Sequence, residues 1–502
     1  MSGSGMGIAL SGLDASQVGL DVVSQNISNA NTPGYIAETA NFTSVQDPLS
    51  LVGGGVQVAS VSQLSDQFQK TIELNANAQQ SYATQTQSVL NQVMTVFQEP
   101  ATNGISEQLA NFWSSFDQVA NNPTNLAARA QVISNAQNLA NTFNQDSNTL
   151  ANLSTATVNS IQSQANSLTS ELSTLASLNG AIHAAGTNSD QTLIDQQNAL
   201  LDKVSSQIGA TIQHQSDGTV NVLLNGVMLV QGNLAQTVSM STVPATSTSP
   251  AVYGLQISGT TNPQVPSSGS VGALLNAVNN TIPFYQTGYV SGGPTNSSNS
   301  LYGVASTLAS LVNNQQWTGD YLVPATSGAT TNYNLFSAAP APSTSPTSPA
   351  TSPTPGMYMF SIAGSGSGQF TMSVNSSLLP TSSPTQANPG PWGIAAANST
   401  SPGAGDGTNA QTMAEFANST AGPDAAWAQL SGQIGLDVSN ANAALNTAQT
   451  NYQSAYQADQ AVSGVQQNQQ MVNMVNYQQS YQAAAKLILT LTQTVQSLLA
   501  AV

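Results

Sequence analysis

Hydrophobic residues recur at helical spacing at both ends of the chain. Over the last thirty or so residues they step alternately by three and four positions, the spacing of the a and d positions of a coiled coil. The positions of this C-terminal seam are Met474, Tyr477, Tyr481, Ala484, Ile488, Leu491, Val495, Leu498 and Val502. A weaker N-terminal pattern of the same spacing runs through Ala9, Leu13, Ser16, Leu20, Val23 and Ile27. The two patterns predict terminal helices that pair with each other.

Between these ends, the pattern predicts a mainly α fold with β insertions. We expect helices over about 63–98, 105–121, 125–185, 189–208, 270–288, 301–316, 424–462 and one starting near 408. Alternating residues over 211–230, with turns at Asp217-Gly218 and Asn225-Gly226, predict a β-meander. Segment 337–404 is rich in Ser, Thr, Pro and Gly, and is expected to form a surface insertion with strands over 357–363 and 369–374.

The predicted elements divide the chain into five regions. They are a terminal coiled-coil domain (1–35 and 465–502), an extended, glycine-interrupted connector (36–62), a helical bundle (63–208 and 408–464, with 270–335 packing near it), a β-meander region (210–269) and the outer insertion (337–404).

The terminal seams could pack only against each other, as an intramolecular helix hairpin without further contacts. Ile8, Leu10, Val18, Val22, Leu487 and Leu499 would then leave apolar residues on other faces, and this favours a seam completed between subunits.

Charge is unusually scarce in this chain. Four Lys and Arg residues stand against 21 Asp and Glu residues, giving a formal net charge of −17, and charged residues make up 5% of the chain. So few cations disfavour a nucleic acid or an anionic membrane as a partner. The chain has no cysteine, so it has no disulfide or thiol chemistry. We find neither a signal-peptide pattern nor an 18-residue apolar run.

Patterns that would support catalysis or metal binding are weak. His183 and His214 are the only histidines, and neither has a metal-ligand partner at useful spacing. The pairs Asp190/Asp195 and Asp14/Asp21 are more simply helix caps and solvated charges than acid–base pairs. Glycines 53–55 lack the Lys-Ser/Thr of a phosphate loop. We therefore predict no enzyme activity, no metal and no cofactor.

Motifs at both termini resemble those of a known family. Residues 9–13 and 23–35, with Asn26, Asn29, Asn31, Thr32, Pro33, Gly34 and Tyr35, resemble the N-terminal signature of bacterial flagellar axial proteins, the rod, hook and hook-associated proteins. Residues 471–486 resemble the matching C-terminal signature. Segments 110–116, 122–129, 200–205 and 405–410 resemble the hook-associated proteins at the first junction between hook and filament. The resemblance covers most of 5–336 and 405–502.

The resemblance implies a structural protein of the flagellum. It would leave the cell through the flagellar type III channel and assemble as a ring at the distal end of the hook. Expected partners are further copies of the chain, the hook protein, the second junction protein (hook-associated protein 3), the filament and a FlgN-type export chaperone, with the filament cap protein only indirectly involved. The assembly interface would use Leu13, Leu20, Val23, Ile27, Tyr477, Tyr481, Ala484, Ile488, Leu491, Val495 and Leu498, and the chaperone would bind Met474, Tyr481, Ile488, Leu491 and Val495.

Two other functions stay open at this stage. A hook or distal rod protein would share the termini, and whether 105–208 is helical separates it from a junction protein. A secreted glycan-binding adhesin would instead use the Ser/Thr/Pro-rich and β-structured middle.

The chain departs from the family at two places. Residues 466–470 are all amides where acidic residues are usual, and 36–38 lacks the usual basic residue. This exchange of charges for amides suggests the hypothesis of an acidic exterior, because amide hydrogen bonds survive at low pH.

Overall fold

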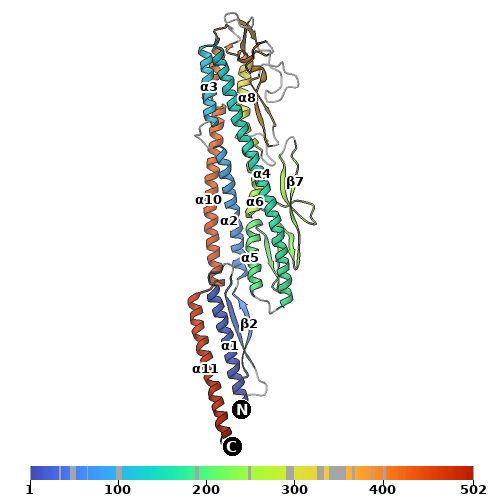
Figure 1. Cartoon of the computed structure of the whole chain (residues 1–502), viewed down its shortest axis with the longest axis vertical. Coiled ribbons are helices and arrows are strands. Elements are labelled where there is room, and N and C mark those ends of the chain that lie inside the picture. The colour runs from blue at the N-terminus through green and yellow to red at the C-terminus, as the bar shows by residue number, and fades with distance from the viewer. Residues whose placement is uncertain are drawn as a thin grey trace.

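The computed structural model shows a long, narrow molecule with both termini at the same end (Figure 1). It describes residues 2–500 except 33–34, 46–52, 65, 98–103, 187–190, 247–249, 290–298, 325–332, 338–357, 365–367, 386–387 and 399–402. Within this part of the chain, no helix is long and apolar enough to cross a membrane. Predicted positions Pro33, Gly34 and Val502 and most of segment 337–357 lie outside the described residues.

The terminal end of the molecule consists of two antiparallel helices and one hairpin, which we call the terminal unit. Helix α1 (Ser2–Asn29) packs against helix α11 (Gln467–Ala500), as predicted. Strands β1 (Glu38–Val45) and β2 (Gly55–Gln63) pair antiparallel and pack on α1. The connector predicted over 36–62 is therefore a hairpin attached to α1.

The central part of the molecule is a helical bundle. Helices α2 (Gln67–Val96) and α10 (Pro423–Ser463) run side by side along the axis, and α2 continues the path of the terminal unit (Figure 1). The other long helices are α3 (Ile105–Asn121), α4 (Leu126–Ala185) and α5 (Gln191–Ile208). The predicted helicity of 105–208 is therefore confirmed for the described residues. Asp66 and Asn125 cap α2 and α4 by accepting backbone N–H bonds, which explains where these helices start.

Shorter helices fill the space between the long ones. Helix α6 (Gly269–Asn276) packs against α2 and α5, followed by a π-helical turn (η2, Ala277–Thr281) and α7 (Ile282–Thr287). The helix predicted over 270–288 is thus interrupted by this π turn. Helix α8 (Leu301–Thr318) packs against α10, and α9 (Thr408–Glu415) packs against α3. One buried hydrophobic cluster runs through these helices and includes Phe112, Phe116, Phe143, Leu172 and Leu430.

Several strands of the β insertions lie beside the long helix α4. A four-stranded meander contains β3 (Thr211–His214), β4 (Val220–Leu224), β5 (Val227–Gln231) and β6 (Leu234–Ala235). Its β4–β5 turn uses Asn225 (φ 49°) and Gly226 (φ 83°), the left-handed pair that a two-residue hairpin requires. The remaining strands are β7 (Val238–Val243), β8 (Val252–Ile257), β9 (Gly319–Pro324), β10 (Tyr333–Ser337), β11 (Phe360–Ala363), β12 (Thr371–Val374) and β13 (Ala397–Asn398), with 3-10 turns η3 (Ser376–Leu378), η4 (Gly390–Gly393) and η5 (Phe416–Asn418). Among the strands that lie beside α4 are β5, β6, β7 and β12. The predicted mainly α fold with β insertions is confirmed.

Candidate assembly interface

Three glycines at seven-residue spacing form the line of α1 that faces α11. A Cβ atom built at Gly19 would lie 2.8 Å from the Tyr477 ring, one at Gly12 would lie 4.0 Å from Ala484 Cβ, and one at Gly5 would lie 3.5 Å from Leu491. The three partners on α11 are also seven residues apart, in reverse order. The absence of side chains on this line therefore lets the two antiparallel helices approach closely along their shared length.

Tyr477 joins all three components of the terminal unit. Its ring lies over Gly19 of α1 and meets the ring of Phe42 in β1 edge-on, with centroids 6.0 Å apart. A surface groove of about 340 Å³ continues from this contact between α1, the hairpin and α11. Its lining residues are Gly12, Ala15, Ser16, Phe42, Val56, Tyr477, Ser480 and Ala484. Aromatic packing thus connects the hairpin to both helices.

The residues predicted for the assembly interface lie in several environments. Among those on α1, Val23 is buried, whereas Leu13, Leu20 and Ile27 are half-buried. On α11, Met474, Tyr477, Ala484, Ile488 and Leu491 are half-buried, Tyr481 and Val495 are exposed, and the side chain of Leu498 lies outside the described part. The residues of α1 that are buried alongside the glycine line are Ala9, Ala15, Ser16, Val22 and Val23. Half-burial leaves the predicted seam available for further contact.

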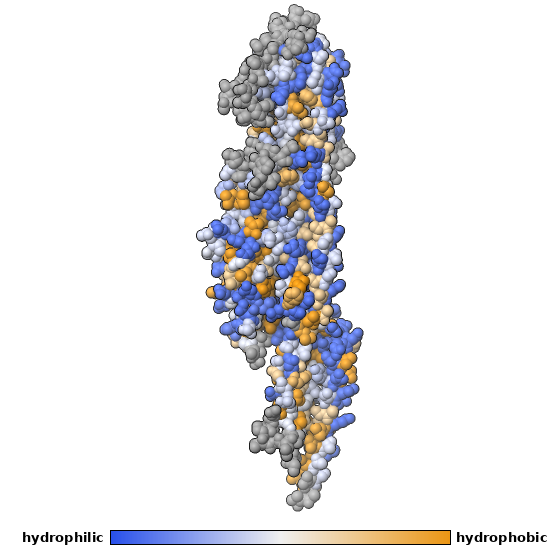
Figure 2. All heavy atoms as spheres, turned by 180° about the vertical axis from the view of Figure 1, so that it is seen from behind, coloured by the Kyte–Doolittle hydropathy of each residue, from blue (hydrophilic) through white to orange (hydrophobic). Residues whose placement is uncertain are grey.

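Helix α11 is covered on one side only. Among its described side chains, Gln470 alone is buried. Several large hydrophobic side chains on its other sides are exposed: Met471, Val472, Val475, Leu487, Leu489 and Leu499, between 46% and 73%. Hydrophobic residues are visible on the surface of the narrow terminal end in Figure 2. An apolar surface of this length on a single helix is characteristic of an interaction site.

The N-terminal family motif folds around one buried amide. Asn26 in the last turn of α1 is 0% exposed, and its Nδ2 donates to the Glu38 carbonyl (2.8 Å). Its Oδ1 accepts from the Glu38 N–H (2.8 Å) and from the Tyr35 hydroxyl (2.8 Å). Thr32 donates to Asn29 Oδ1, and Asn31 is exposed. Asn26 and Tyr35 therefore fix the path of the chain from α1 into β1.

The terminal unit meets the bundle at the ends of α10 and β2. The Ala37 N–H donates to the Ser463 carbonyl (2.8 Å), and the Leu64 N–H donates to the Ala37 carbonyl (2.9 Å). Gly464 ends α10, and a Cβ there would lie 2.4 Å from the Gln460 carbonyl oxygen. A cleft of about 620 Å³ lies at this junction, between the hairpin and helices α2, α5 and α10.

Charged residues inside this cleft are grouped around one lysine. Lys70 Nζ donates to Glu73 (2.6 Å) and to Asp202 (2.7 Å). Burial lowers the pKa of Lys70, but the two carboxylates outweigh it and raise this pKa to about 12. Burial raises the pKa of Glu73 and of Asp202, and Lys70 opposes that rise. His214 also lines the cleft, and burial lowers its pKa.

Asparagines on helices bind β-strand backbones at five places in the described chain. In each, one side-chain amide donates to the carbonyl and accepts from the N–H of the same residue, and we call this arrangement an amide clamp. The clamps join Asn26 to Glu38, Asn144 to Met372, Asn179 to Val220, Asn279 to Tyr253 and Asn313 to Phe360, with distances of 2.7–3.1 Å. The clamps attach β-structure to helices without using charge.

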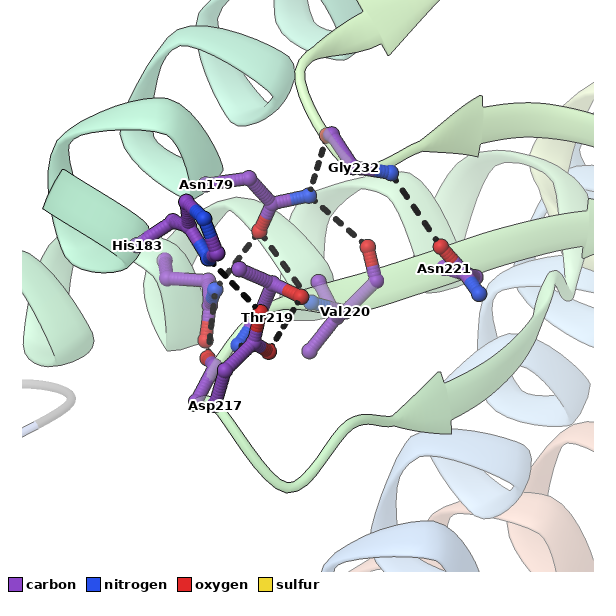
Figure 3. Close-up of polar contacts among 9 residues, drawn as sticks. Asn179, His183, Asp217, Thr219, Val220, Asn221 and Gly232 are labelled. Atoms are coloured by element: carbon purple, nitrogen blue, oxygen red, sulfur yellow. Dashed lines mark hydrogen bonds and ion pairs between the residues drawn. The ribbon is translucent and has the colours of Figure 1, made fainter. Parts of the chain in front are cut away.

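The clamp at Asn179 lies in a larger polar network between α4 and the meander (Figure 3). Asn179 Nδ2 also donates to the Gly232 carbonyl (2.8 Å), and Gln197 donates to Asn179 Oδ1 (2.9 Å). Nearby, His183 Nδ1 lies 2.9 Å from Asp217 Oδ2. The hydroxyl and backbone N–H of Thr219, together with His183, lower the pKa of Asp217 to about 2. Of the other predicted carboxylates, Asp195 accepts from Gln63, Asp14 and Asp21 are exposed, and Asp190 lies outside the described residues.

Sequence reasoning missed the glycine line and the clamps. The spacing of Gly5, Gly12 and Gly19 is a readable signal, but a hydrophobicity pattern gives no weight to glycine. It also missed Arg129, which is 0% exposed and donates to the carbonyls of Pro123, Trp392 and Ile394. The clamps had no signal, because each depends on a strand brought to the asparagine by tertiary structure.

Comparison with known protein families gives two matches. Residues 90–330 match the family described as the helical domain of the flagellar hook-associated protein FlgK. Residues 6–35 match the family of flagella basal body rod proteins. The second match covers Gly12 and Gly19 of the glycine line and the motif from Asn26 to Tyr35. The first covers α3 to α8.

Individual relatives agree with these matches. The chain is similar to flagellar hook-associated protein 1 of Escherichia coli strain K12 (26% identity over 283 residues, 53% of this chain and 51% of the relative). It is also similar to the proteins of that name from Salmonella typhimurium (28% over 281 residues, 53% and 50%) and Bacillus subtilis (28% over 227 residues, 43% and 45%). The chain thus spans about half the length of the curated relatives it matches.

The fold is also found among solved structures. One of them is the flagellar hook junction protein FlgK from Burkholderia pseudomallei, with a TM-score of 0.53, 19% sequence identity, and coverage of 78% of this chain and 100% of that one. At this level of identity the likeness concerns the fold alone.

Proposed function

We propose that this chain, a FlgK-type member of the flagellar hook-associated proteins, is a structural component of the bacterial flagellum that connects the hook to the filament. The observation that carries the proposal is the one-sided packing of α11, whose apolar outer face has no cover within the described chain. A structural protein that assembles needs an apolar surface for its neighbours, whereas an enzyme needs a set of catalytic side chains placed together. The chain acts by assembly and not by catalysis.

Assembly takes place through the terminal unit. Copies of the chain form a ring at the distal end of the hook, with the α1–α11 pairs on the inside and the bundle and its β insertions outside. The half-buried seam from Met474 to Leu491 supports this arrangement, because its remaining surface is free to pack on a neighbour. Helices in proteins gain most of their stability from the packing of one face, so α11, which is covered on one side only, becomes ordered as each copy is added.

The ring connects a bending hook to a stiff filament, and this requires an articulation within each copy. The hairpin moves with α1, because Asn26 and Tyr477 hold it there. The articulation therefore lies at the junction where Ala37 binds Ser463 and Gly464 separates α10 from α11. A Gly464→Ala variant, whose methyl group would collide with the Gln460 carbonyl, should alter the tilt of the terminal unit and shorten swimming runs, with Gly432→Ala in open space as its control.

Neighbouring components are the hook protein, the second junction protein and the filament. Before export, a FlgN-type chaperone covers the C-terminal seam at Met474, Tyr481, Ile488, Leu491 and Val495. The exposure of Tyr481 and Val495 supports this, because a chaperone can reach them on the described chain. Deletion of 471–502 should abolish chaperone binding in a pull-down assay, and unchanged binding would exclude this site.

The test of the function is electron microscopy of flagella from a strain that lacks the chain. Hooks that end bare, with filament subunits released into the medium, are the expected result. Absent hooks would place the chain in the hook or rod. Normal flagella would refute a flagellar role and favour a glycan-binding adhesin. Complementation with Leu491→Asp should leave hooks bare, whereas the exposed, polar position Thr492→Asp on the same helix should restore filaments.

A further inference from the structure

Two open helix faces remain on the terminal unit after its internal contacts are made. On α1, the residues that face neither α11 nor the hairpin are exposed: Leu10, Asp14, Gln17, Asp21 and Ser24. On α11, the open face contains Met471, Val475, Lys486 and Leu489. Each face carries charge beside an exposed leucine, since Leu10 is four residues before Asp14 and Leu489 is three residues after Lys486.

The charges on these two faces have opposite sign and no partner within the described chain. Lys486 is one of only four cations in the whole sequence, and the other three lie in the bundle. Lys70, Lys203 and His183 form ion pairs within the described chain, whereas Lys486, Asp14 and Asp21 form none there. A chain with so few cations thus places one of them, exposed, on the helix that lacks cover.

The glycine line gives the heights of these charges along the shared axis. Gly5 faces Leu491, Gly12 faces Ala484 and Gly19 faces Tyr477, so Lys486 lies level with Leu10. Asp14 is four residues further along α1, which is about 6 Å at 1.5 Å per residue. Asp21 is eleven residues away, or about 17 Å. Because the copies of a ring lie at the same height, a lysine side chain can span the offset of about 6 Å to Asp14 of a neighbour, but not the offset of about 17 Å to Asp21.

We propose that the open face of α11 in one copy packs on the open face of α1 in the next, with Lys486 paired to Asp14 of that neighbour. The occupant is a second copy of this chain, and the argument for it is the complementary charge on the two faces. Because the faces belong to different helices, the contact is heterologous and generates a ring or helical array. The inference rests on the proposed function and adds the register of neighbouring copies to it.

The charge pair sets the register, while the apolar residues supply most of the binding. A partly exposed ion pair contributes little to affinity but opposes wrong alignments. Lys486→Asp should therefore reduce the fraction of hooks that carry filaments several-fold, and Asp14→Lys in the same chain should restore it. Asp21→Lys is the matched control, because it adds the same charge on the same face at the wrong height, and it should not rescue Lys486→Asp.

Cross-linking tests the register directly, because the natural chain has no cysteine. Lys486→Cys and Asp14→Cys are placed in separate full-length chains, which are co-expressed in the deletion strain, and isolated flagella are treated with a short bismaleimide. A covalent dimer is expected only when both variants are present. The control pair, Lys486→Cys with Asp21→Cys, should give none.

The outcomes separate this inference from the proposed function. If neither cysteine pair cross-links although the chain complements filament growth, the register is refuted and the junction function stands. If the Asp21→Cys pair cross-links as well as the Asp14→Cys pair, the assigned register is equally refuted. If wild-type chain neither enters flagella nor restores filaments, the proposed function itself fails.

Discussion

Substituting Gly19 by alanine tests whether close approach on the glycine line holds α11 in place. Alanine at an open helix position adds about 1 kcal/mol of helix stability relative to glycine. At Gly19, however, the new methyl carbon would lie 2.8–2.9 Å from three carbons of the Tyr477 ring, so the ring or the helix must move. Overpacking of this kind costs about 1–3 kcal/mol. The expected net effect ranges from near zero to a loss of about 2 kcal/mol.

Gly12→Ala is the matched control, because its methyl carbon would lie 4.0 Å from Ala484 Cβ, an ordinary contact. It should gain about 1 kcal/mol. The assay is native-state hydrogen exchange of α11 amides around Tyr477 and Ala484 in the full chain assembled into isolated flagella, where about 1.4 kcal/mol corresponds to a tenfold change in exchange. Gly19→Ala should exchange faster than Gly12→Ala by about five- to hundredfold. Equal protection in the two variants would refute the packing argument.

Three further substitutions test other parts of the fold. Asn179→Asp replaces the amide donor of a buried clamp by a carboxylate that faces two carbonyls, and it should lower the stability of the meander by about 3 kcal/mol or more in chemical unfolding. Asn221→Asp is the control, because it keeps an oxygen that accepts from the Gly232 N–H, and it should change stability little. Equal losses in the two variants would contradict this. Arg129→Met leaves the carbonyls of Pro123, Trp392 and Ile394 without this donor and should cost about 3 kcal/mol or more, because each buried carbonyl left without a hydrogen bond costs about 1–3 kcal/mol. The loss should appear as faster proteolysis near 390–398, and unchanged cleavage would contradict it. Burial raises the pKa of Glu73 and Asp202, so the folded state binds protons more readily than the unfolded chain, and the cluster should gain stability as pH falls from neutral toward the ordinary pKa of a carboxyl group. Glu73→Gln should show a smaller rise in Tm, and an identical rise would exclude the cluster as its source.

The helical part of the fold could be predicted closely from the sequence. The helix predicted over 105–121 is observed over the same residues, because Phe112, Phe116 and Val119 give a clear apolar face. The same reasoning named Leu13 and Leu20 as interface residues, both of which are half-buried, and left out the glycines, whose Cβ positions face α11. Hydrophobic periodicity locates an apolar face, but it does not detect a helix contact made by the absence of side chains.

The polar part of the structure could not be predicted, because its partners are distant in sequence. Asn26 reaches a residue 12 positions away, and Asn313 reaches one 47 positions away. Before the strands are placed, each asparagine is one among many in an amide-rich chain. The Lys70 cluster is similar, since Asp202 is 132 residues from Lys70. Only the tertiary fold distinguishes these residues from the solvated amides and carboxylates around them.

The amide clamps support the hypothesis that the protein works in an acidic exterior. None of the five clamps loses or gains a proton at low pH, and they attach the hairpin, the meander and the outer strands to their helices. Asp217 contributes stability above its ordinary pKa of 3.8, and this is lost only as pH falls through about 2. Glu73 and Asp202 act in the opposite sense and stabilise the fold as they become protonated. Because these five connections between strands and helices do not depend on ionised carboxylates, the assembled protein should persist at about pH 3. Dissociation at that pH but not at neutral pH, measured by sedimentation of isolated flagella, would show that ionised carboxylates hold the copies together.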